Sequence, residues 1–193
     1  MGSFLETIYD VLFKPTAAMH YIAEKKLTGQ ALTMFVISML VPVLAVYISI
    51  KDLPGVPAFG ILFVLNIIGS FFSWVLGAAV LSFVAELFGG KGTAVGLFAA
   101  MGFSHLPRVA AIPLWVIAAL MPGGIRGLLL GIVGLIVFIW TLTLQVAALR
   151  GAHGLSATKA VLVLIAPMLA IIGGVTALII FLSTSLMQLP FAF

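Results

Sequence analysis

ELFGGKGTAVGLFAAMGFSHLPRV, residues 86–109, combines a glycine-rich turn with four ionisable side chains. The turn consists of Gly89, Gly90, Lys91 and Gly92. The apolar runs on either side are each longer than the roughly 20 residues that cross a lipid bilayer. This stretch is therefore predicted to join two membrane-spanning helices and to hold most of the polar groups near them.

The composition excludes an ordinary soluble domain. Hydrophobic residues make up 64% of the 193-residue chain and charged residues 7%, whereas soluble domains carry roughly a quarter of charged residues. The chain contains no cysteine, which excludes disulfides, thiolate metal sites and cysteine nucleophiles. The predicted fold class is an all-α integral membrane protein with the lipid bilayer as its main partner and no nucleic acid.

Working outward from the opening stretch, the apolar runs predict five membrane-spanning helices. Their expected ranges are 28–50, 58–88, 93–121, 127–149 and from Ser156 to about 186, with Thr93 and Ser156 as N-caps. The third run would measure about 43 Å as a single helix, against a hydrocarbon core of about 30 Å. It is predicted to kink at Pro107, with its first half tilted near the inner interface; Pro42 and Pro167 are predicted kinks in two other helices.

Residues 1–27 are predicted to form an amphipathic interfacial segment, and residues 28–193 the five-helix domain. Phe4, Ile8 and Leu12 share one helical face, while Glu6 and Asp10 lie elsewhere around the helix. These two acids, and the absence of a basic leader, argue against a cleavable signal. The segment is expected to lie in the headgroup region.

Basic residues predict the orientation. Six of them fall in the loops on one side and two, Lys51 and Arg126, in those on the other. The positive-inside rule then places the N-terminus in the cytoplasm and the C-terminus outside. The inner basic rim is expected to attract anionic headgroups and consists of Lys25, Lys26, Lys91, Arg150 and Lys159.

Three ionisable side chains of the opening stretch are predicted to form an intramembrane cluster. Helix lengths place Glu86 and Arg108 at similar depth, and His105 precedes Arg108 by three residues on the same face. A charge inside the membrane is costly unless it is paired or faces a cavity. The cluster could lock two helices together or form a functional site; alternatively, the charges could snorkel separately to headgroups.

Other residues within the spans suggest helix packing. Gly127, Gly131 and Gly134 form a small-residue face that is predicted to pack helices within the monomer, with a homodimer seam as the second possibility. Isolated polar residues are expected to bond neighbouring helices: Asn66, Ser70, Ser73 and Gln145.

Three motifs resemble the Yip-domain membrane proteins (Ypt-interacting proteins), in particular their compact prokaryotic branch. They are VLFKPTAAM at 11–19, AELFGGKGTAVGLFAAMGFSHLP at 85–107 and RGAHGLSATKAVLVLIAP at 150–167. The resemblance covers essentially the whole chain. It implies five membrane helices with a cytosolic N-terminus, in the cell membrane of a prokaryote. Eukaryotic members are longer at the N-terminus and bind Rab GTPases and partner Yip-type proteins; the family supplies no cofactor and no catalytic residue.

The predicted function is a non-enzymatic scaffold that organises the membrane or binds a membrane-protein partner, without a cofactor. The alternative is a small permease or channel that uses the cluster of Glu86, His105 and Arg108. Catalysis is disfavoured because Ser104 and His105 are adjacent and point about 100° apart on a helix, so they cannot form a nucleophile–base pair.

Overall fold

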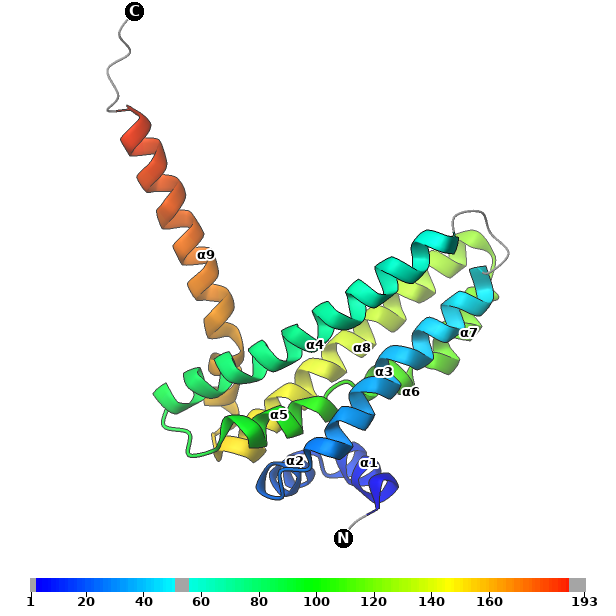
Figure 1. Cartoon of the computed structure of the whole chain (residues 1–193), viewed down its shortest axis with the longest axis horizontal. Helices are drawn as coiled ribbons and strands as arrows, with labels where there is room; N and C mark the ends of the chain where they lie inside the picture. The colour runs from blue at the N-terminus through cyan, green and yellow to red at the C-terminus, as the bar shows by residue number, and fades with distance from the viewer. Residues whose placement is uncertain (1–2, 51–55, 188–193) are drawn as a thin grey trace, which may run out of the picture.

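Helices are the only regular structure within residues 3–50 and 56–187, which the computed structural model describes (Figure 1). The helices are α1 (Phe4–Phe13), α2 (Pro15–Glu24), α3 (Thr28–Ile50), α4 (Val56–Leu87), α5 (Ala94–Phe103), α6 (Leu106–Ala110), α7 (Ile112–Ala119), α8 (Gly123–His153) and α9 (Ala157–Met187). The predicted all-α membrane fold is confirmed.

Four apolar segments in the described ranges are long enough to cross a bilayer. They are Phe63–Leu87, Ala94–Ala118, Gly123–His153 and Ala157–Ser185. A shorter apolar segment, Thr28–Leu40, belongs to α3, whose helical backbone has 23 residues. The set agrees with the five predicted spans and makes the chain a multi-pass membrane protein.

The helix ends follow local chemistry. The Thr93 hydroxyl accepts a hydrogen bond from the Gly96 N–H at 3.1 Å, and that of Ser156 accepts one from the Lys159 N–H at 3.4 Å, so both predicted N-caps are confirmed. The helix α8 begins four residues before the expected start, at Gly123. In lipid, only a helix satisfies the backbone N–H and C=O groups, which outweighs the poor helix propensity of glycine.

The third span is broken into α5, α6 and α7 rather than bent once. Pro107 and Pro113 each occupy the second position of a new helix, where a missing N–H costs nothing. The Ser104 hydroxyl donates to the Met101 carbonyl at 2.7 Å in the first break. The kink predicted at proline is confirmed, with a second break at Ala111. Pro167 lies inside α9, and the side chain of Pro42 falls outside the described residues, so kinks at these two positions stay predictions.

The helix α5 was expected near the interface, but it forms the centre of the bundle. Leu97, Ala99, Ala100 and Phe103 are 0% exposed, and α5 packs against α2, α3, α4 and α8 (Figure 1). Its glycine and alanine residues explain the position, because small side chains let neighbouring helices approach closely.

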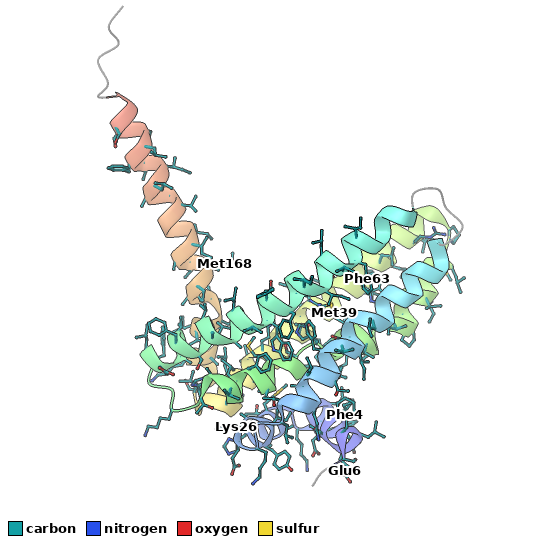
Figure 2. All side chains as sticks on the ribbon, viewed as in Figure 1. Phe4, Glu6, Lys26, Met39, Phe63 and Met168 are labelled. Atoms are coloured by element: carbon teal, nitrogen blue, oxygen red, sulfur yellow. The ribbon has the colours of Figure 1, made fainter. Side chains whose placement is uncertain are left out.

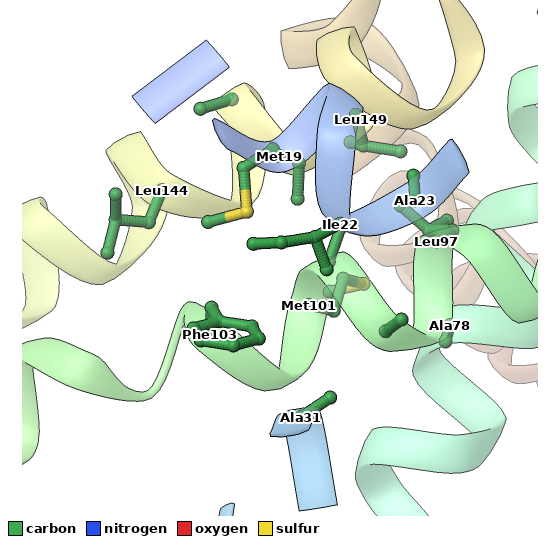
Figure 3. Close-up of a cluster of buried hydrophobic side chains, with 14 of the residues drawn as sticks. Met19, Ile22, Ala23, Ala31, Ala78, Leu97, Met101, Phe103, Leu144 and Leu149 are labelled. Carbon is green, nitrogen blue, oxygen red and sulfur yellow. The ribbon is translucent and has the colours of Figure 1, made fainter. Parts of the chain in front are cut away.

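The N-terminal helices α1 and α2 cover one end of this bundle, where Glu6 and Lys26 lie (Figure 2). Met19 and Ile22 of α2 are fully buried in the same cluster as Leu97 and Leu149 (Figure 3). The three residues of the predicted apolar face of α1 differ in their contacts. Phe4 and Ile8 pack against the core, whereas Leu12 is 41% exposed, because Val11, fully buried, sets which side faces the protein.

Candidate functional site

Two glycine-rich turns meet at the end of the bundle that α1 and α2 cover. The Lys91 N–H donates to the His153 carbonyl at 3.1 Å, and the Gly92 N–H donates to the His153 Nδ1 atom at 3.2 Å. Gly89, with φ of 87°, makes the left-handed turn that starts this approach. The predicted turn of Gly89–Gly92 is therefore held against the end of α8 by hydrogen bonds to one histidine.

The helix α2 closes the same region from the other side. The His20 Nδ1 atom and the Gly151 carbonyl are 3.0 Å apart, within hydrogen-bonding distance. A Cβ atom added to Gly151 would lie 2.6 Å from the His20 backbone nitrogen, so α2 and α8 are in backbone contact here. The surface helix α2 is thus fixed rigidly to a membrane-spanning helix.

A cavity of about 770 Å³ lies between these elements, and we call it the inner groove. Its lining residues come from α2, the glycine turn and the end of α8: Thr16, Ala17, His20, Gly89, Lys91, Arg150, Gly151, Ala152, His153 and Gly154. Lys91 and Arg150 are exposed at its mouth. Lys159 stands nearby, its ammonium group donating to the Phe88 carbonyl at 3.0 Å, which neutralises the end of α4.

The chemistry of the inner groove suits an anion. It combines two permanent cations with two imidazoles, and the His153 Nε2 atom is buried without a hydrogen-bond partner. Glu86 is the acid that acts electrostatically on His153. The described part of the chain contains no group of three His, Cys, Asp or Glu side chains that could hold a metal ion.

The predicted cluster of Glu86, His105 and Arg108 is not assembled. Within residues 3–50 and 56–187, the ion pair is His20–Glu24, at 4.0 Å, and Glu86 pairs with neither His105 nor Arg108. His105 and Arg108 instead line a cavity beside Trp74. Twelve residues, about 18 Å of helix, separate Trp74 from Glu86 along α4.

The prediction of this three-residue cluster failed for a physical reason. The prediction placed residues 93–106 tilted near the inner interface, which kept His105 shallow. Because α5 is buried and runs back along α4, His105 lies deep in the bundle, and its ring centroid is 6.2 Å from that of Trp74. Glu86 lies at the C-terminal end of α4, and it forms no ion pair with Arg108 and shares no cavity with His105 among the described residues.

The prediction that Gly127, Gly131 and Gly134 pack helices within the monomer is also wrong. A Cβ atom added to Gly127, Gly131 or Gly134 would meet nothing within 4 Å, so these residues do not bring helices together within the monomer. A homodimer seam there stays a prediction. The described glycines that allow close packing are Gly90, Gly92, Gly96, Gly102 and Gly151.

Sequence reasoning missed His20, His153 and Gly151. His153 follows Gly151 in the RGAHG turn, and a histidine between two turn glycines was the available signal. His20 gave no comparable signal, because only the docking of α2 brings it to the groove.

Comparison with known proteins gives one family. The Yip1 domain family model matches residues 9–179. No curated protein and no solved structure matches the chain. The match extends from α1 into α9, so it includes α2, the inner groove and the broken third span. With most of its length matched, the chain belongs to the Yip1 domain family of membrane proteins.

Proposed function

We propose that this protein is a non-enzymatic membrane scaffold whose inner end binds anionic lipid headgroups. The observation that carries the proposal is the inner groove, a cavity with Lys91 and Arg150 at its mouth on a rigid platform of docked helices. A fixed platform presents the same set of charges to the headgroups at all times, so little ordering entropy opposes binding.

The rim around the groove extends the basic surface. Lys25, Lys26, Lys91 and Arg150 are exposed and form no ion pair among the described residues. Each such cation near a membrane surface contributes about 1 kcal/mol of attraction to anionic lipid. Lys159 contributes less, because its ammonium group already bonds the Phe88 carbonyl.

The side of α1 that faces away from the protein core supports the same role. Leu5 is 75% exposed, Tyr9 60% and Phe13 67%. The other side of α1 is fixed to the core by Val11. Apolar side chains on a helix at the membrane surface insert into the boundary between headgroups and acyl chains. The platform would thus hold headgroups by charge and acyl chains by apolar contact.

The alternative function, a permease or channel, needs an acidic residue in its site that this arrangement does not supply. It required Glu86, His105 and Arg108 in one site, and Glu86 is not among the described residues that line the cavity of His105 and Arg108.

Removing two inner cations is expected to weaken headgroup binding about thirtyfold. Lys91→Gln combined with Arg150→Gln removes about 2 kcal/mol of attraction. Native mass spectrometry of the full chain can measure the affinity for phosphatidylglycerol. The matched control removes two cations from the outer side, Lys51→Gln with Arg126→Gln, and should leave the affinity unchanged. Equal affinity in the inner double variant and the unmodified protein would contradict the proposal.

The orientation on which this role depends can be tested directly, because the chain has no cysteine. Lys91→Cys is expected to react with a membrane-impermeant maleimide only in inside-out vesicles, and Arg126→Cys only in intact cells. The reverse pattern would place the inner groove on the outer surface and refute the predicted topology.

A further inference from the structure

A second cavity, of about 660 Å³, lies within the membrane, and we call it the membrane groove. Its polar lining residues are Asn66, Ser70, Ser73, Trp74, Ser104, His105, Arg108 and Gln145. It is bounded by α3, α4, the α5–α6 break and α8. Along α4 it reaches from Leu65 to Leu81, which is about 24 Å of helix and most of the hydrocarbon core.

The shape of the groove follows from the break after α5. Trp74 is stacked between Phe98, with ring centroids 4.1 Å apart, and Phe35, at 4.8 Å. The Trp74 indole N–H also donates to the Phe98 carbonyl at 3.1 Å. This packed layer forms one wall. After the turn at 104–105, His105 packs edge-on against Phe35 and Trp74, with ring centroids 5.5 and 6.2 Å apart, and Arg108 also lines the groove.

Four of the polar side chains of the groove lack hydrogen-bond partners among the described residues, whereas Trp74 and Ser104 bond backbone carbonyls. Asn66, Ser70, Ser73 and Gln145 form no hydrogen bond to any described residue, so the expected bonds to neighbouring helices are not made. Three threonines elsewhere in the helices, by contrast, bond the carbonyl four residues earlier. The distances are 3.0 Å for Thr33, 2.9 Å for Thr143 and 2.8 Å for Thr176.

The charge in the groove is also uncompensated. Arg108 is the fifteenth residue of the 25-residue span Ala94–Ala118, close to its middle. It has no ion pair and no side-chain hydrogen bond among residues 3–50 and 56–187. The nearby His105 Nδ1 atom is buried and unpartnered as well. A cation at this depth is costly unless a counter-charge or a polar cavity accommodates it.

We propose that the membrane groove binds the phosphate group of a phospholipid that enters sideways from the bilayer. A guanidinium binds a phosphate through two parallel charge-assisted hydrogen bonds. Ser70, Ser73 and Asn66 supply neutral donors around it, and none of the described residues that line the groove is a carboxylate that would repel an anion. The volume lies within the range of small-molecule sites, roughly 300–1,000 Å³.

The exposure of α4 favours a lipid over an anion from water. Leu65, at the edge of the groove, is 59% exposed, and Asn66, Gly69 and Ser73 are exposed beside it. Since these residues belong to the apolar span Phe63–Leu87, their open side faces acyl chains. A phospholipid can place its headgroup in the groove and leave its chains in the bilayer. This site is separate from the inner groove and does not depend on the proposed scaffold function.

Photocrosslinking from two positions of α4 tests the site with the polar residues of the groove unchanged. Leu65 lines it and Phe72 does not, although both are 59% exposed. A photoreactive residue replaces one or the other, and the protein is placed in nanodiscs of a phosphate-free galactolipid that contain a minority of phosphatidylglycerol. Adducts from position 65 should be enriched in phosphatidylglycerol about tenfold over its mole fraction, and adducts from position 72 should match that fraction. Adducts that match the mole fraction at both positions would overturn the proposal.

The role of Arg108 is tested in the same assay. Arg108→Gln should abolish the enrichment at position 65, whereas Arg126→Gln, at an arginine near the start of α8 that bonds the Met121 carbonyl, should preserve it. Galactolipid adducts from position 72 show that each variant is inserted and folded. Enrichment that persists in a folded Arg108→Gln protein would overturn the assignment of Arg108. Inorganic phosphate in the buffer should not displace the lipid; displacement would instead identify a site for a free anion and overturn the lipid assignment.

Discussion

Replacing Gly151 with alanine is expected to destabilise the protein by about 3 kcal/mol, the upper part of the range for overpacked sites. The added Cβ atom would lie 2.6 Å from the His20 backbone nitrogen and 2.8 Å from the Met19 carbonyl carbon. Backbone atoms cannot rotate away, so α2 would have to move off α8. That movement would also break the contact between His20 and the Gly151 carbonyl and uncover Met19 and Ile22.

The matched control is Gly131→Ala in the same helix. Nothing lies within 4 Å of a Cβ atom there, and alanine favours a helix interior by up to about 1 kcal/mol over glycine. Denaturation by sodium dodecyl sulfate in mixed micelles gives the free energy of unfolding for both variants. A Gly151→Ala protein as stable as the Gly131→Ala protein would show that α2 is not fixed to α8 as described.

Truncating Trp74 to alanine is expected to cost about 3–5 kcal/mol, the range for large aromatic side chains in a core. Trp74 is 5% exposed, stacked between Phe35 and Phe98 and bonded to the Phe98 carbonyl. Lipid is as apolar as the protein interior, so helices in a membrane are held by close packing and hydrogen bonds rather than by exclusion of water. Removal of the indole eliminates the close packing and the hydrogen bond at the contact of α3, α4 and α5.

Two variants separate these contributions. Trp74→Phe keeps an aromatic ring and loses the hydrogen bond, so it should cost about 1 kcal/mol from that bond and somewhat more from the smaller ring. Trp115→Ala removes an indole that is 40% exposed on α7 and should change the free energy of unfolding by less than about 1 kcal/mol. The same denaturation measurement applies. Equal losses for Trp74→Ala and Trp115→Ala would contradict the aromatic layer as a stabilising contact.

The long-range arrangement explains why the candidate site was only partly predictable. Composition and helix length predicted the turn of Gly89–Gly92 and its neighbour, the RGAHG turn, as separate loops on one side of the membrane. Their contact through His153 requires α8 to end beside α4, which no local pattern encodes. The sequence predicted similar depths for Glu86 and Arg108, but the depth of His105 depended on whether α5 lies on the surface or in the centre of the bundle.

The sequence by itself determined that the chain folds in a lipid bilayer, and it determined the number of membrane spans. It also determined the helix caps at Thr93 and Ser156 and a break near Pro107. Each of these depends on a property local to a few residues or on total apolar length, because backbone groups in lipid must be satisfied within their own helix. Only the tertiary structure decided which glycines pack tightly, which face of α1 meets the protein, and that Arg108 faces a cavity without an acid. In lipid, an apolar pattern does not distinguish a face that contacts another helix from a face that contacts lipid. The complementary shapes of side chains on neighbouring helices therefore determine which faces pack together.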